Sequence, residues 1–139
     1  LEANSTEDEH DCFSDNTHNS HFYNAKGIRN VYLGEYLKAD GSTLSGPSLS
    51  DLVAKADAQA DSTLKADLQA SESKLQALVD SAEKNRVHFD QLIAADNKAG
   101  QQIIRDAITA LVTQTAAIEQ AAKKLGISDL NPDTADHQF

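Results

Sequence analysis

The sequence is poor in residues that cross-link or stiffen a chain and in the large rings that fill a core. Its 139 residues include no methionine, no tryptophan, one cysteine and two prolines, and aromatic residues make up 5%. Cys12 has no partner for an internal disulfide, so we interpret it as a small buried apolar residue, with a bridge to another segment as the alternative. Because rings are scarce, the core must be built from alanine, leucine, isoleucine and valine.

Long apolar runs are absent as well. No stretch approaches the roughly 18 apolar residues of a membrane span, and no charged-then-apolar leader opens the chain, so neither a transmembrane segment nor a signal peptide is predicted. The chain lacks an initiator methionine, and leucine at position 1 is not a residue before which that methionine is normally removed. We therefore expect a piece of a longer protein.

Positive charge is in short supply. Lysine and arginine number 12 against 22 aspartates and glutamates, which gives a net charge of −10. Binding to phosphate backbones requires clustered lysine and arginine, so the composition argues against nucleic acid and anionic membrane surfaces as partners. An acidic surface can attract cations, although its commonest effect is solubility.

A first helix is predicted after the acidic N-terminal stretch, which suits the positive end of a helix dipole. Ser14 or Asp15 is the expected cap. A stripe at steps of three and four, the period of one helix face, follows; its members are Phe22, Ala25, Arg29, Tyr32 and Tyr36. Gly27 and Gly34 share a face, and we expect them to permit close approach of another backbone rather than to mark helix ends.

Turn-forming residues fill positions 40–47 and predict a loop, after which Pro47 or Ser48 opens a short helix. A long helix is expected next, followed by a short helical turn or corner at 86–95. Its stripe alternates steps of four and three and consists of Leu64, Leu68, Ser71, Leu75, Leu78 and Ala82.

The last helix is expected to be capped by Asp96 or Asn97 and ended by Gly126. Its stripe consists of Ile104, Ile108, Leu111, Thr115, Ile118, Ala122 and Leu125. Two such stripes are what helices need to pack at a shallow angle. The sequence therefore predicts an all-α antiparallel helical bundle, with a lead-in at 1–10 and a tail at 127–139.

Chemistry-bearing side chains gather before and within the first helix. The constellation is His10, Asp15, Asn16, His18 and His21. In a helix, His18 neighbours both Asp15 and His21 at a spacing of three residues, so either pair can share one metal ion, and nitrogen with carboxylate oxygen suits iron or zinc. The alternatives are exposed or capping histidines, and helix capping by the run from Ser14 to Thr17. His88 is the one histidine of the expected turn at 86–95, and we interpret its side chain as hydrogen-bonded to backbone carbonyls.

Several short sequence motifs in this chain resemble those of the imelysin family of bacterial cell-envelope proteins. They are Phe13-Ser14-Asp15-Asn16-Thr17-His18, the run from Gly27 to Tyr36, Asp40-Gly41-Ser42 and the run from Gly46 to Val53, with a weaker likeness at His88-Phe89-Asp90-Gln91 and at 94–97. The likeness covers the second half of such a protein. It implies an all-helical, two-lobed protein, located in the periplasm or anchored as an outer-membrane lipoprotein. The family is associated with iron uptake and was first labelled as metallopeptidases.

The resemblance also implies site residues. Carried over by position, the ligand-binding residues are Ser14, Asp15, Asn16, His18, Arg29 and Tyr32, and the metal ligands are His18 and Asp15. The family's Gly-x-His-x-x-Glu motif belongs to the other half, and this chain contains no His-x-x-Glu. The expected function is therefore one wall of a polar ligand or metal site shared with an N-terminal half, for iron, an iron chelate or a peptide.

Two alternatives remain open. One is a metal-dependent peptidase whose centre is completed by the N-terminal His-x-x-Glu motif; because a zinc hydrolase needs three protein ligands, an open water position and a base, the sequence leaves enzymatic activity undecided. The other is a helical module with a structural role.

Overall fold

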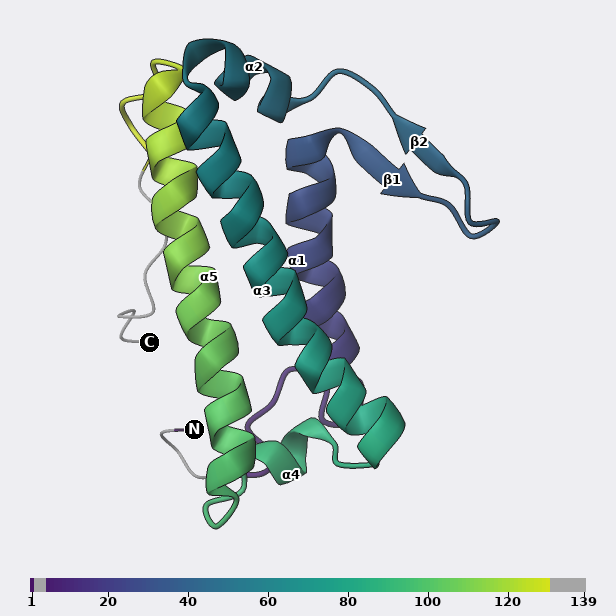
Figure 1. The fold of residues 1–139 in the computed structure, drawn as a ribbon. Coiled ribbons are helices and arrows are strands. Elements are labelled where there is room, and N and C mark those ends of the chain that lie inside the picture. Colours follow the sequence, from purple (N-terminus) through teal and green to yellow (C-terminus); the bar gives the residue numbers. More distant parts are fainter. Residues whose placement is uncertain (2–4, 131–139) are drawn as a thin grey trace.

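Three long helices make up most of the computed structural model, which describes residue 1 and residues 5–130. Its elements are α1 (Thr17–Leu33), β1 (Glu35–Leu37), β2 (Thr43–Ser45), α2 (Leu49–Ala56), α3 (Ala58–Asn85), α4 (Phe89–Ile93) and α5 (Lys98–Lys124). The central helix, α3, packs against both α1 and α5 and runs antiparallel to each of them (Figure 1). The predicted all-α bundle is confirmed. Of the expected lead-in and tail, residues 2–4 and 131–139 lie outside the described part.

The helices of the described residues are amphipathic rather than uniformly apolar. None of them combines the length and the hydropathy that a membrane crossing requires.

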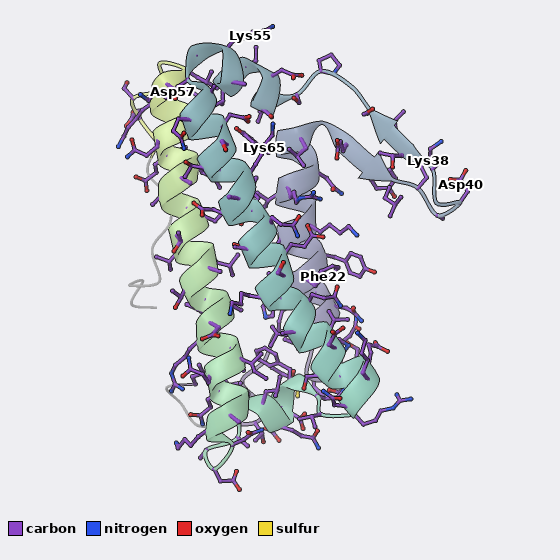
Figure 2. The ribbon with its side chains drawn as sticks, in the orientation of Figure 1. Phe22, Lys38, Asp40, Lys55, Asp57 and Lys65 are labelled. Carbon is purple, nitrogen blue, oxygen red and sulfur yellow. The ribbon has the colours of Figure 1, made fainter. Side chains whose placement is uncertain are left out.

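An antiparallel hairpin, β1–β2, stands where the sequence predicted the end of the first helix and a loop. Tyr36 pairs with Leu44 across the two strands and is therefore not part of the helical stripe. Gly34 ends α1 in the left-handed conformation, with φ 63°, and a Cβ on it would lie 2.8 Å from the carbonyl oxygen of Gly46. The prediction for Gly34 was half right, because it permits a close backbone approach and also ends the helix. The hairpin projects away from the bundle, with Lys38 and Asp40 at its tip (Figures 1 and 2).

The start of α1 differs from the prediction by one or two residues. Asn16, not Ser14 or Asp15, is the N-cap, and its side chain makes no capping hydrogen bond. Ser14 instead donates its hydroxyl to the carbonyl oxygen of Asp11. Asp15 has φ 52°, which is sparsely populated by residues other than glycine but tolerated by aspartate. This turn leads the chain into α1 with the Asp15 side chain free to reach another element.

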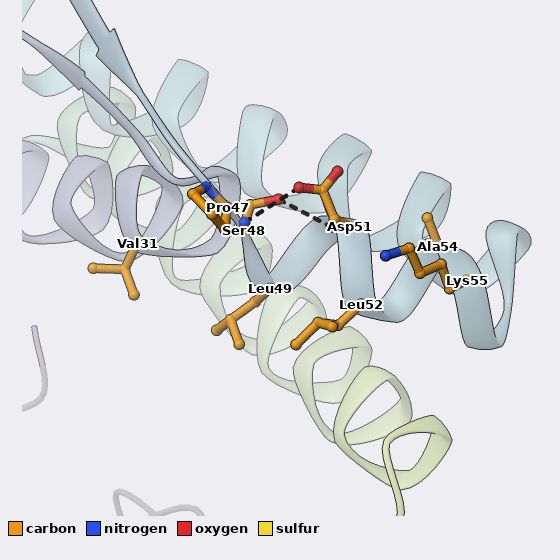
Figure 3. Close-up of a pocket in the computed structure, with 8 residues that line it drawn as sticks. All are labelled: Val31, Pro47, Ser48, Leu49, Asp51, Leu52, Ala54 and Lys55. Carbon is orange, nitrogen blue, oxygen red and sulfur yellow. Dashed lines mark hydrogen bonds between the residues drawn. The ribbon is translucent and has the colours of Figure 1, made fainter.

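The other helix ends follow the sequence closely. Ser48 caps α2 through a capping box, in which its hydroxyl accepts the Asp51 N–H while the Asp51 carboxylate accepts the Ser48 N–H (Figure 3). Asn97 caps α5 by accepting the N–H of Gly100, and Gly126, with φ 80°, follows its C-terminus. These predictions are confirmed.

The core is divided into two apolar clusters along α3. The lower cluster, at the α4 end, contains Phe22, Ala25, Leu75, Leu78, Leu92, Ile93, Ile104 and Ala107. The upper cluster contains Tyr32, Val53, Leu64, Leu68, Ala117 and Ala121. All six predicted stripe residues of α3 are buried.

The stripe on α5 is rotated from the predicted one. Ala107, Gln114, Ala117 and Ala121 are buried against the bundle, whereas Ile108 is 50% exposed. Small alanines let α5 approach α3 closely, and this preference for close packing outweighs the burial of the larger Ile108. Cys12 is exposed, so its interpretation as a buried apolar residue is wrong.

Candidate functional site

A polar cluster lies at the foot of α1, where the end of α3 and the start of α4 meet it. His18, in the first turn of α1, is only 3% exposed. Its ring contacts the ring of His88, with centroids 5.7 Å apart and planes nearly perpendicular. Two residues separated by 70 positions in the sequence are thus brought together by the turn from α3 into α4.

The two ring nitrogens of His18 have different surroundings. Nε2 lies 3.4 Å from Glu83 Oε1 and 3.2 Å from Asn19 Nδ2, so it either donates to the carboxylate or accepts from the amide, depending on the tautomer. Nδ1 is buried and has no hydrogen-bond partner among the described residues. Buried ring nitrogens are normally hydrogen-bonded, so Nδ1 is a group whose partner still has to be explained.

The Asp15 carboxylate reaches the same cluster. Its Oδ2 lies 3.0 Å from Nδ1 of His88, close enough for an ion pair when the imidazole is protonated, but not aligned as a hydrogen bond. The left-handed backbone of Asp15 directs this contact. Strained backbone is most often retained at sites where it positions a functional group. His88 therefore makes a side-chain contact in place of the predicted bonds to backbone carbonyls.

The other polar residues of the motif from Ser14 to Thr17 make hydrogen bonds that shape the loop before α1. Asn16 Oδ1 accepts a hydrogen bond from the amide of Asn19, and the hydroxyl of the fully buried Thr17 accepts the Asp11 N–H. Ser14 and Asn16 are exposed beside Asp15. Their hydrogen bonds hold the loop in shape.

Arg29 and Tyr32, which the resemblance grouped with this site, lie elsewhere on α1. They follow His18 by three to four turns, or roughly 16 to 21 Å along the axis. Arg29 Nη1 is 3.4 Å from Glu72 Oε2 on α3, and the Tyr32 hydroxyl donates to Asp61 Oδ1 at 2.8 Å. Burial, reinforced by Asp61, raises the pKa of Tyr32, so its proton is held in that hydrogen bond. The structure does not bring these two residues into the polar cluster.

His21 belongs to a second histidine pair. Its ring contacts those of His10, at 5.8 Å between centroids, and Phe89, at 5.6 Å. Burial lowers the pKa of His21, and the neighbouring His10 lowers it further. The two rings thus have different partners, because the ring of His18 contacts His88 whereas the ring of His21 contacts His10.

Among the described residues, no three side chains of histidine, cysteine, aspartate or glutamate are grouped so that they hold a metal ion. The donors of the His18 cluster nevertheless suit part of a coordination shell. A histidine that ligates a metal through one nitrogen usually donates the other to a carboxylate, and Glu83 stands in that position for His18.

Sequence reasoning missed two members of this cluster. His88 lies in the motif His88-Phe89-Asp90-Gln91, which resembles the imelysin family only weakly. That weak resemblance was the sequence signal that could have pointed to His88. Glu83 lies 65 residues from His18 and had no signal, because its role depends on where α3 ends relative to α1.

A family model described as Imelysin (Peptidase_M75) matches residues 1–118 of the chain. Comparison with curated proteins gave no match. The family match includes all of the polar cluster.

Proposed function

The chain belongs to the imelysin family, and on that premise we propose that it acts in bacterial iron uptake at the cell envelope. It is the C-terminal helical half of a longer, two-half protein, in the periplasm or anchored to the outer membrane as a lipoprotein. The cluster of Asp15, His18, Glu83 and His88 forms one wall of a polar site that is completed by the N-terminal half. The cargo is iron or an iron chelate, with a peptide as the other ligand to be tested.

The observation that carries this proposal is the unpartnered Nδ1 of His18. A buried polar atom without a hydrogen bond costs about 1 to 3 kcal/mol, so a ligand that satisfies it gains that energy. When Nε2 donates to Glu83, Nδ1 presents a lone pair, which is the form that binds a metal ion.

Sharing between two halves follows from the incompleteness of the cluster. Protein iron sites use at least three nitrogen or oxygen donors, and among the described residues no three histidine, cysteine, aspartate or glutamate side chains are grouped to hold a metal ion. The side chains of Asp15 and Glu83 are about half exposed, at 51% and 57%, so their carboxylates are accessible to a group approaching from outside. Further donors from an N-terminal half would complete the shell.

A metal-dependent peptidase is the second candidate. It would require three ligands, an open position for water and a base, and the described residues contain no such group. The ligands and base would therefore have to come from a His-x-x-Glu helix of the other half. Peptide cleavage that a chelator abolishes and added metal restores would favour this candidate over a carrier role.

Substitution of His18 is the direct test of the proposed site. In the two-half protein, His18→Ala is expected to weaken binding of ferrous iron, measured anaerobically by equilibrium titration, by at least about tenfold, because a donor aimed into the site is lost. His21→Ala is the matched control, since it removes a half-buried histidine from the next turn of α1 and should leave the affinity unchanged.

Circular dichroism must show that both variants remain folded. Equal iron affinity of wild-type protein and a folded His18→Ala variant would show that His18 does not bind iron, and would contradict the proposed site.

A further inference from the structure

A second pair of histidines, outside the polar cluster, joins the segment before α1 to two helices. We call this segment, residues 5–12, the entry loop. The ring of His10 in the entry loop contacts the ring of His21 on α1, with 5.8 Å between their centroids and the planes tilted by 58°. The ring of His21 also contacts Phe89, the first residue of α4, at 5.6 Å. Three rings therefore tie the entry loop to α1 and α4.

Residues 5–10 depend on this contact for their position. Within the described part of the chain, their hydrogen bonds stay inside the entry loop. Asp11 is the first residue of the loop with a hydrogen bond to a helix, since its N–H donates to the hydroxyl of Thr17 at 2.9 Å. That bond involves no group that titrates. Separation of His10 from His21 would therefore free the loop as far as Asp11 and leave the turn before α1 in place.

The contact between the two imidazoles changes with their charge. Neutral rings attract each other as aromatic groups do, whereas two protonated rings carry like charges and repel. Burial lowers the pKa of His21 below the usual 6.5 and the nearby His10 lowers it further, although Asp11 acts in the opposite direction. Once the entry loop leaves, the ring of His21 is hydrated and its pKa returns toward the usual value. The released state therefore binds more protons than the docked state.

This difference fixes the sign of the pH dependence. A group whose pKa is lower in the docked state stabilises that state fully above its value in the released state, which is about 6.5 for an imidazole. The stabilisation is lost as the pH falls through the lower pKa of the docked state. The entry loop should therefore be docked at neutral pH and released in mild acid.

The other charged side chains around the two rings do not change this result. Asp8 and Glu9 of the entry loop and Arg105 of α5 line the same hollow. Aspartate, glutamate and arginine ordinarily titrate well outside the range from about pH 5.5 to about 7.5. Hydrogen bonds, first of all from Ser20, lower the pKa of the Asp11 carboxyl, so it stays ionised in this range. The histidines are the groups in this hollow whose charge changes.

We propose that the contact between His10 and His21 is an acid-sensitive latch. With both rings neutral it holds the entry loop on α1 and α4, and with both rings protonated it releases residues 5–10. The loop forms one wall of a hollow that also contains Ile93, Ile104 and Ile108, so release exposes apolar surface in mild acid. The latch goes beyond the proposed function, and its operation requires no ligand in the polar cluster.

Distances between spin labels test the latch in the whole protein, without added metal. In a Cys12→Ser background, one label is attached at Glu7→Cys in the entry loop and the other at Ala70→Cys on α3, because both positions are exposed. At about pH 7.5 we expect one main distance, that of the docked loop. At about pH 5.5 the population of a second, broader distance should rise at least about threefold, because protonation favours the released loop.

Two comparisons make the test specific. Labels at Ala70→Cys and Ala116→Cys, at exposed positions on α3 and α5, should keep their distance at both pH values. His21→Gln removes the proton acceptor, and it should abolish the difference between the two pH values whichever position the loop then takes.

An unchanged distance between Glu7→Cys and Ala70→Cys would overturn the proposal, and so would an acid response that His21→Gln retains. A change in the α3–α5 distance at the lower pH would also overturn it, since the bundle itself would then be unfolding.

Discussion

Replacement of Asp61 by alanine is expected to lower the free energy of unfolding by roughly 1 to 3 kcal/mol for each buried hydroxyl that it leaves without a hydrogen-bond acceptor. Asp61 is 6% exposed and joins three helices. Its Oδ1 accepts hydrogen bonds from the hydroxyls of Tyr32, at 2.8 Å, and Ser50, at 2.7 Å, and its Oδ2 lies 2.8 Å from Lys65 Nζ. Alanine would leave two buried hydroxyls without an acceptor. Urea unfolding followed by circular dichroism measures the change.

Asp80 on the same helix provides the control. It also pairs with a lysine four residues on, Lys84, but its side chain is 38% exposed. Asp80→Ala should therefore change stability by no more than about 0.5 kcal/mol. If both variants lost similar stability, the buried network would not be what ties α1 and α2 to α3.

The same network predicts a dependence on pH. Burial alone would raise the pKa of Asp61, but the hydrogen bonds from Lys65, Ser50 and Tyr32 outweigh it and hold the pKa below the usual 3.8. A depressed carboxyl pKa means that its stabilisation is complete above the unfolded value and is lost as the pH falls through the folded one. Wild-type protein should lose this contribution below about pH 4, and Asp61→Asn should lack it at every pH.

Leu78→Ala is expected to cost about 2 to 5 kcal/mol, because it leaves a cavity in the lower cluster. Leu78 is 2% exposed and packs in the cluster that includes Phe22 of α1, Leu92 of α4 and Ile104 of α5. This cluster fixes the end of α3 against the first turn of α1, so it also supports the contact between Glu83 and His18. Chemical denaturation gives the magnitude.

Leu52→Ala is the comparison for that variant. Leu52 on α2 is 50% exposed, and its truncation should cost less than about 1 kcal/mol in the chain alone. A loss at Leu52 as large as that at Leu78 would contradict the assignment of the core.

Much of the fold was readable from the sequence because its signals are local. The stripe from Leu64 to Ala82 needs only helical periodicity to define one buried face, and Ser48 and Asn97 cap the next turns of their own helices. The rotation of α5 was not readable in this way. Whether Ala107 or Ile108 faces α3 depends on how closely two helices can approach, which is a property of both together. The hairpin was missed because Tyr36 continues a helical stripe while Gly34 interrupts the backbone.

The candidate site was predicted less completely for the same reason. The polar motif around His18 indicated where the site lies. The partners of His18, however, come from the C-terminal end of α3 and from the turn that follows it. Sequence spacing suggested His21 as a partner, whereas the fold pairs His21 with His10 and Phe89. Arg29 and Tyr32 lie in the same family motif, from Gly27 to Tyr36. Each of them contacts a residue of α3 well above the polar cluster.

The central claim, that this cluster is one wall of a shared iron site, is tested most directly by comparing iron binding in two forms of the protein. Titration of ferrous iron into the two-half protein and into the chain alone, under the same anaerobic conditions, gives the two affinities. We expect one tight site in the two-half protein and binding at least about tenfold weaker in the chain alone, since part of the coordination shell is then missing. Equal affinity in the two forms would contradict it.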